Sequence, residues 1–166
     1  FKVIHTDLPD LISQKAQQHN IDKFIHLSAL GIDEAIDSNY AKSKTLAEMA
    51  AWDFVKEENN PFELAVINPA LVIGPSLSGD IGESNKAIEL VATGKMPVGV
   101  PIQFGYVDVR DVAAAHILAM QNPNSNGKRF ALSEKDLWYK DVAKILRANG
   151  FDKAPKYSVP AWITPL

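Results

Sequence analysis

The stretch KFIHLSAL, from Lys23 to Leu30, is short and largely apolar. Such a run is typical of a strand in a parallel sheet that is covered on both faces. A second run of this kind, FELAVINP, spans Phe62–Pro69, and the apolar spacing between the two predicts a helix over Tyr40–Glu58 that ends before Pro61. Parallel strands need a crossover connection, so this order predicts the α/β class with a parallel sheet.

The same alternation continues on both sides of this segment. Before it, Asp7 or Asp10 is expected to cap a helix that runs to about Asn20. After it, the pattern predicts, in order, a helix over Ser84–Thr93, an extended piece over Gln103–Val109, a helix VAAAHILAM opened by Asp108 and Asp111, a strand KRFALS, and a helix from Asp136 or Lys140 to Asn149.

The composition is that of one ordinary globular domain, with 166 residues of which 46% are hydrophobic and 22% charged. Seventeen Lys and Arg against twenty Asp and Glu give a net charge of −3, so no basic field is present to bind nucleic acid or a membrane surface. The sequence has no Cys, which excludes disulfides and a cysteine nucleophile and agrees with a cytoplasmic location. Its longest apolar stretch, Leu64–Ile73, is too short to cross a bilayer.

Three polar residues form the sharpest candidate for chemistry. Tyr40 and Lys44 are four residues apart and share one helix face. An ammonium beside a phenol favours the phenolate and lowers its pKa, which makes a usable general acid or base. Ser28 ends the first strand, where its hydroxyl can bind a carbonyl or alcohol oxygen. The alternative is that Tyr40 is a helix-start aromatic and Lys44 a solvated neighbour, since Y-x-x-x-K also recurs by chance.

Four segments in order, FIHLSALG, YAKSKTLAE, AVINPALVIGP and FGYVDVRDVAAAH, resemble landmarks of the extended short-chain dehydrogenase/reductase superfamily, also called the NAD-dependent epimerase/dehydratase family. The stretches SKTLAEMAAWDF and GKRFALSE are most similar to its dihydroflavonol-reductase-like branch. The resemblance implies the second half of a Rossmann-like fold with a small α/β substrate-covering region. On this view residues 1–166 form a single partial domain, with the catalytic core over about 1–73 and a mixed core and lid region over about 74–166.

The resemblance also implies a function, that of an NAD(P)-dependent oxidoreductase acting on a carbonyl or alcohol group. Tyr40 would exchange a proton with the substrate oxygen while hydride moves to or from NADP or NAD, and Ser28 would position that oxygen. Lys44 would also bind the nicotinamide ribose. The loop Gly74–Ser84 would flank the substrate and Met96–Gln103 would form part of a lid. The implied cofactor-binding residues are Tyr40, Lys44, Asn68, Pro69, Ala70, Leu71 and Val72.

One departure from the family pattern leaves the serine open. Family members with a Ser-Ser pair at the strand end usually use the second serine, and here Ser28 is followed by Ala29. The role falls to Ser28, to Ser43 or to no residue. The front segments HTDLPD and KFIHLSALGI also resemble a branch that includes an accessory subunit of respiratory complex I. A nucleotide-sugar epimerase or dehydratase and a non-catalytic cofactor-binding subunit therefore stand as alternatives, although the presence of Tyr40 and Lys44 favours an enzyme.

A dinucleotide site needs a Gly-rich turn between a strand and a helix, and no G-x-x-G-x-x-G spacing occurs here. Two explanations compete, part of a longer enzyme or a short protein that has discarded cofactor binding, and the first is favoured. We therefore expect the chain to need the missing N-terminal half and to show little activity alone. A small-molecule substrate and a possible homodimer are the expected partners.

The remaining charged and histidine residues are expected to be structural, and no metal site is expected. His26 and His116 lie on apolar elements, and neither has a ligand partner at metal spacing. His5, Asp7 and Asp10 form a helix-capping cluster, and Asp108, Arg110 and Asp111 a cap with a salt bridge. Lys140, Lys144 and Arg147 are expected to form a solvated helix face.

Overall fold

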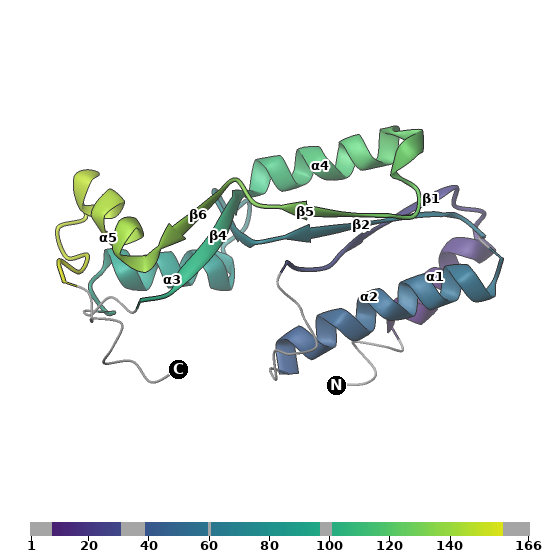
Figure 1. The fold of residues 1–166 in the computed structure, drawn as a ribbon, viewed down its shortest axis with the longest axis horizontal. Coiled ribbons are helices and arrows are strands. Elements are labelled where there is room, and N and C mark those ends of the chain that lie inside the picture. Colours follow the sequence, from purple (N-terminus) through teal and green to yellow (C-terminus); the bar gives the residue numbers. More distant parts are fainter. Residues whose placement is uncertain (1–7, 31–38, 60, 97–100, 158–166) are drawn as a thin grey trace. The chain divides into compact units, whose positions relative to one another are not determined.

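The computed structural model describes residues 8–30, 39–59, 61–96 and 101–157. The chain divides into two compact units (Figure 1): the first consists of Phe1–Ala70 and Asp111–Leu132, and the second of Leu71–Arg110 and Ser133–Leu166. The expected organisation, one partial domain with a core over about 1–73 and a mixed core and lid region over about 74–166, stays a prediction.

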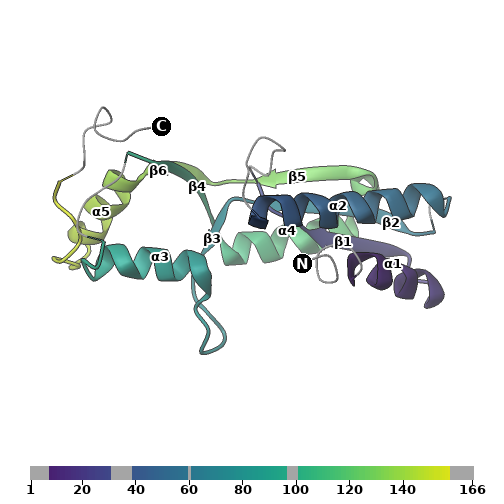
Figure 2. The ribbon, with the colours of Figure 1, turned by 90° about the horizontal axis from the view of Figure 1, so that it is seen from below.

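The first unit is built on a sheet of three parallel strands in the order β1-β2-β5. These strands are β1 (Lys23–Leu27), β2 (Glu63–Pro69) and β5 (Lys128–Leu132). The helices α1 (Leu8–Gln18) and α2 (Asn39–Glu57) lie on one side of the sheet, and α4 (Val109–Gln121) lies on the other (Figures 1 and 2). A short 3₁₀ helix, η2 (Pro123–Ser125), precedes β5. This arrangement confirms the predicted α/β class and the parallel sheet.

An aromatic cluster fixes α2 on this sheet. Phe54 of α2 stacks on Phe62 with ring centroids 6.1 Å apart, and Phe24 of β1 meets Phe62 edge-on at 5.8 Å. Ala51 and Leu64 complete the buried cluster. The helix that carries Tyr40 and Lys44 is therefore anchored to the strands at its other end by apolar packing.

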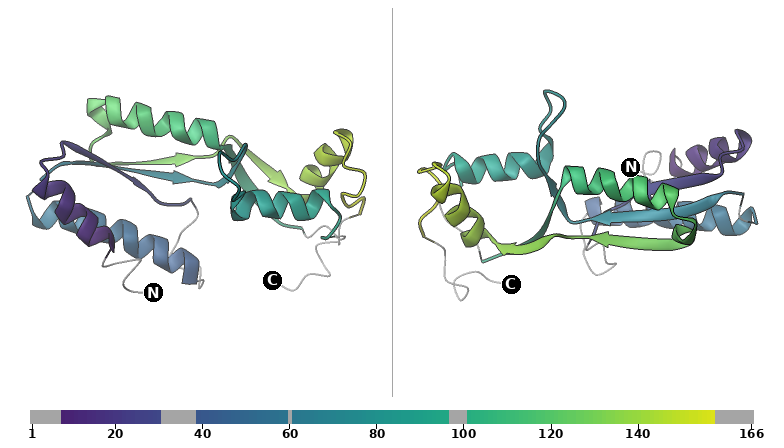
Figure 3. Two further views of the ribbon diagram at one scale, coloured as in Figure 1. Left: turned by 180° about the vertical axis from the view of Figure 1, so that it is seen from behind. Right: turned by 90° about the horizontal axis from the view of Figure 1, so that it is seen from above.

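The second unit has a sheet in the order β3-β4-β6, in which β3 and β4 are parallel and β4 and β6 antiparallel (Figure 3). Its elements are β3 (Leu71–Ile73), α3 (Gly82–Ala92), β4 (Gln103–Asp108), β6 (Lys135–Trp138) and α5 (Tyr139–Ala148). Val91, Tyr139 and Ala143 form its core. The sequence did not predict β3 or β6, because the first is three residues long in a Gly- and Pro-rich stretch and the second resembles a helix start.

The start of α4 is capped as predicted. The Asp108 carboxylate accepts hydrogen bonds from the backbone N–H of Arg110 at 2.8 Å and from the Arg110 side chain at 2.8 and 2.6 Å. These contacts lower the pKa of Asp108 to about 2. Asp111 lies in the first turn of the same helix, where an acid is favourable to the helix dipole.

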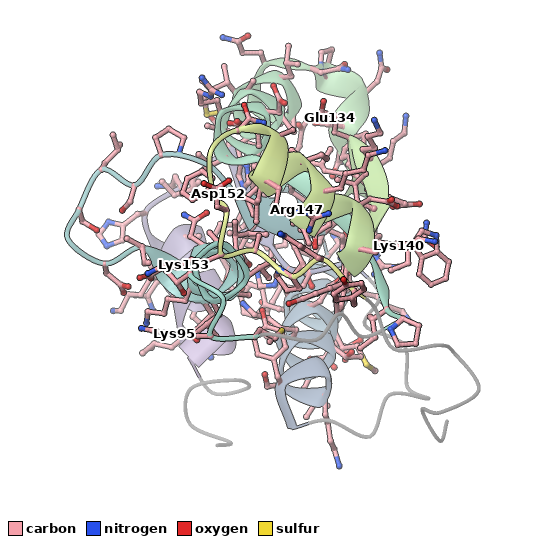
Figure 4. All side chains as sticks on the ribbon, turned by 90° about the vertical axis from the view of Figure 1, so that its left-hand side faces the viewer. Lys95, Glu134, Lys140, Arg147, Asp152 and Lys153 are labelled. Carbon is pink, nitrogen blue, oxygen red and sulfur yellow. The ribbon has the colours of Figure 1, made fainter. Side chains whose placement is uncertain are left out.

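The basic face expected on α5 is only partly solvated. Lys140 and Lys144 are exposed, whereas Arg147 is half-buried and donates to the carbonyl of Pro155. Figure 4 shows the acidic side chains Glu134 and Asp152 among the basic residues of this unit. Opposite charges are thus interspersed there, as the small net charge suggests.

Two further features concern the described residues alone. Within these ranges, none of the helices combines the length and apolarity that crossing a bilayer requires. The same ranges contain no group of three His, Asp or Glu side chains arranged to hold a metal ion.

Gly94 gives the first testable prediction. Gly94 and Gly150 both have positive φ, at +72° and +89°, but only at Gly94 would a Cβ meet backbone, 2.6 Å from the carbonyl oxygen of Lys153. We expect Gly150→Ala to cost about 1–2 kcal/mol of conformational strain, and Gly94→Ala to cost about 1–3 kcal/mol more because the carbonyl must move. Urea unfolding of both variants measures the difference. Equal losses would contradict the close approach at Gly94.

Candidate active site

The carboxyl ends of β1 and β2 form the floor of the candidate site. The ladder between these strands continues beyond β1, because the N–H of Ser28 donates to Ile67 O at 2.8 Å and that of Leu30 to Pro69 O at 2.7 Å. The chain is therefore paired over the whole predicted stretch Lys23–Leu30. Ser28 lies at the strand end, as expected.

The strand register places several polar side chains on one face of the sheet. His26 pairs with Val66 and Val66 pairs with Arg129, so these three residues point to the same side. Ser28 and Asn68, two residues further along their strands, point to that side as well. The face is the one covered by α2, since Asn68 and Arg129 both contact a side chain of that helix.

On α2, Tyr40 and Lys44 are neighbours as their spacing predicts. The Lys44 Nζ lies 5.9 Å from the centroid of the Tyr40 ring. The Tyr40 side chain is 65% exposed, so its hydroxyl is open to a ligand. Glu48 and Trp52 follow at the same four-residue spacing and extend this stripe along the helix.

The structure distinguishes the two candidate serines. Ser43 is buried and its hydroxyl donates to the carbonyl of Tyr40 at 2.7 Å, which ties up the donor in the first turns of α2. Ser28 is 4% exposed, and its Oγ has no hydrogen-bond partner among the residues that the structure describes. Of the two serines, Ser28 is therefore the one whose hydroxyl is not engaged by another described group.

The expected cofactor-binding segment is divided between the two units. In the first unit, the Asn68 side-chain amide donates to Glu48 Oε2 at 3.0 Å and to Ala29 O at 3.3 Å, and the N–H of Ala70 donates to Leu132 O at 2.9 Å. Leu71 and Val72 belong to the second unit, where they form β3. A role for these residues in cofactor binding stays a prediction. The expected lid, Met96–Gln103, includes residues 97–100, which lie outside the described residues.

Glu48 is a site residue that the sequence reasoning missed. It is only 6% exposed, and both its carboxylate oxygens accept from Arg129, through Nε at 2.5 Å and Nη2 at 3.3 Å. Burial raises its pKa, but the hydrogen bonds from Arg129, Asn68 and Trp52, with the Ser28 hydroxyl close by, outweigh burial and leave the pKa below the usual value. Ser28 thus lies near this carboxylate, although its Oγ is outside hydrogen-bond geometry.

His26 and His116, the two histidines expected to be structural, behave largely as predicted. The His116 Nδ1 lies 2.7 Å from Val112 O within α4. His26 packs with its ring 6.5 Å from that of Phe24. Burial lowers the pKa of His26. The charge of Glu48 opposes this shift and that of Lys44 adds to it, so both charged groups lie within electrostatic reach of the ring. The expected capping cluster of His5, Asp7 and Asp10 falls on residues whose side chains lie outside the described part of the chain.

Comparison with known proteins identifies relatives of this chain. No protein-family model matches the chain. It is 46% identical over 108 residues to a cinnamoyl-CoA reductase of Medicago truncatula, a match that covers 65% of this chain and 32% of the relative. It is 40% identical over 119 residues to an NADPH-dependent methylglyoxal reductase of Saccharomyces cerevisiae, covering 66% of this chain and 34% of the relative.

A solved structure agrees with these relatives. The structure of the yeast methylglyoxal/isovaleraldehyde reductase complexed with NADPH superposes with a TM-score of 0.73 at 23% identity, over 84% of this chain and 52% of that one. The match supports the Rossmann-like fold. The chain spans about a third of the length of the two curated relatives. Motifs, fold and relatives agree, and the chain therefore belongs to the extended short-chain dehydrogenase/reductase superfamily.

Proposed function

We propose that this chain supplies the proton-transfer part of an NAD(P)-dependent reductase that acts on a small carbonyl compound or on the matching alcohol. The observation that carries the proposal is the Lys44 ammonium 5.9 Å from the exposed Tyr40 ring. The Ser28 hydroxyl, which is buried and without a partner among the described residues, lies on the sheet face that α2 covers. A phenol and a hydroxyl that can share one substrate oxygen suit proton transfer to oxygen.

Each residue has a distinct role in this proposal. Tyr40 gives a proton to the carbonyl oxygen in reduction and takes it back in oxidation. Ser28 hydrogen-bonds the same oxygen and fixes its position. Lys44 places its ammonium beside the Tyr40 ring and offers a donor to the nicotinamide ribose. The nicotinamide, when bound, supplies or accepts the hydride.

The residues present fit the nicotinamide end of the cofactor. Tyr40 is 65% exposed, and Ser28 Oγ and Asn68 Oδ1 are buried polar atoms without a partner in the part of the chain that the structure describes. The Gly-rich turn that holds a pyrophosphate is not among the sequence motifs. We infer that an additional dinucleotide-binding half completes the site.

Three finer points belong to the same proposal. NADPH is favoured over NADH as the cofactor, because the Saccharomyces cerevisiae relative is described as NADPH-dependent. A cytoplasmic location is consistent with a sequence that has no Cys. A homodimer is the proposed assembly.

The test is an assay of the complete natural protein that contains these residues. We expect oxidation of NADPH with at least one member of a panel of aldehydes, ketones and acyl-CoA thioesters. Nucleotide sugars serve as the comparison panel. Conversion of a nucleotide sugar without net oxidation of the cofactor would instead indicate an epimerase. Binding of NADPH without turnover of any compound would indicate a non-catalytic subunit. The 166 residues alone are expected to show little turnover.

A further inference from the structure

Glu48 is the best-connected buried acid that the structure describes, and neither the family resemblance nor the proposed chemistry gives it a role. Its carboxylate accepts hydrogen bonds from Trp52 on its own helix, from Asn68 at the end of β2, and from Arg129 in β5. Arg129 is 81 residues away in the sequence. One carboxylate thus joins α2 to two strands of the sheet.

Fold stability alone is a weak reason for such an arrangement. Removing a carboxylate from water costs several kcal/mol, and replacing a buried ion pair by apolar residues is often neutral or stabilising. The Arg129 side chain is 61% exposed, so this charge could be solvated without Glu48. A buried, multiply bonded acid does fix one geometry, because its oxygens can meet all the donors in only one arrangement.

The fixed geometry lies at the candidate site. Through the Asn68 amide, which also donates to Ala29 O at 3.3 Å, Glu48 is linked to the carbonyl of the residue that follows Ser28. Along α2, Glu48 is one turn from Lys44 and two turns from Tyr40. Both Lys44 and Glu48 act electrostatically on His26, which neighbours Ser28 on the same strand face.

We propose that Glu48 is a positioning residue that sets the rotation of α2 against the strand ends, and so the placement of Tyr40 and Lys44 relative to Ser28. The proposal rests on the proposed reductase function. Glu48 acts through Arg129 and Asn68 and need not contact substrate or cofactor. A helix turned slightly about its axis would leave the fold intact but misplace the Tyr40 hydroxyl, and a displacement of about 1 Å can cost about 10²-fold in rate.

The test compares Glu48→Gln with Glu57→Gln in the complete protein. Glu57 lies on the same helix with an exposed side chain, so the chemical change is matched. In Glu48→Gln we expect kcat per folded molecule to fall by about 10–100-fold, with the KM for the carbonyl and the Kd for NADPH within about twofold. Trp52 gives a readout independent of turnover, because its indole N–H donates to Glu48 and its fluorescence emission should shift.

A second variant covers the case in which Glu48→Gln does not fold. Arg129→Gln changes a mostly exposed side chain, and we expect it to lower kcat in the same direction, with partial rescue by Arg129→Lys. The backbone amide signals of Ser28 and Ala29 should move in the NMR spectra of both Gln variants. Unchanged kcat in both variants of an active enzyme would overturn the positioning role alone. An inactive wild-type protein would overturn the proposed function, and the positioning role with it.

Discussion

Replacing Tyr40 by Phe is expected to lower kcat of the complete protein by about 10²–10⁴-fold, the usual contribution of a positioned general acid or base. The substitution removes one hydroxyl and leaves the ring that lies 5.9 Å from the Lys44 Nζ. Because the Tyr40 side chain is 65% exposed, removal of its hydroxyl should not affect folding. The Kd for NADPH should stay within about twofold, since the substitution leaves the other proposed cofactor-binding residues unchanged.

The measurement combines steady-state kinetics with a fluorescence titration of NADPH. Tyr157→Phe is the matched control, because Tyr157 is an exposed tyrosine outside the candidate site. This control should retain wild-type kcat. A Tyr40→Phe enzyme with kcat near that of wild type would remove Tyr40 from the proton-transfer role and leave the reductase proposal without its acid.

The elements of the first unit could be predicted from the sequence because their signals are local. The apolar run from Lys23 and the Pro61 stop signal mark β1 and the end of α2 within a few residues. Tyr40 and Lys44 share a face because helix geometry alone puts them there. The short strands β3 and β6 depend on pairing with β4 and have no such local signal.

The Glu48 network could not be predicted for a different reason. The four-residue spacing places Glu48 on the same face of α2 as Lys44, but it does not predict which side chain of the sheet contacts Glu48. Arg129 is its partner only because β5 pairs in parallel beside β2, which brings together residues 81 apart. The choice between Ser28 and Ser43 also needed coordinates, because either hydroxyl could face the site until Ser43 is seen to donate to Tyr40 O.

Replacing Phe62 by Ala is expected to lower the free energy of unfolding by about 3–5 kcal/mol, the cost of deleting a buried aromatic side chain. Phe62 is 5% exposed and is the ring that contacts both Phe54 of α2 and Phe24 of β1, so its loss leaves a cavity between helix and sheet. Urea unfolding followed by circular dichroism measures the change.

Leu118→Ala is the control for this truncation, because Leu118 is a 65% exposed apolar residue on α4 and should change stability by less than about 0.5 kcal/mol. A similar loss at both positions would mean that the aromatic cluster is not the anchor of α2. If only Phe62→Ala destabilises, the apolar packing around Phe54 holds α2 on the sheet, and the proposed orienting role of Glu48, in the middle of α2, is a separate one. Loss of Phe62 should then reduce the folded fraction, whereas loss of the Glu48 charge should reduce kcat within the folded fraction.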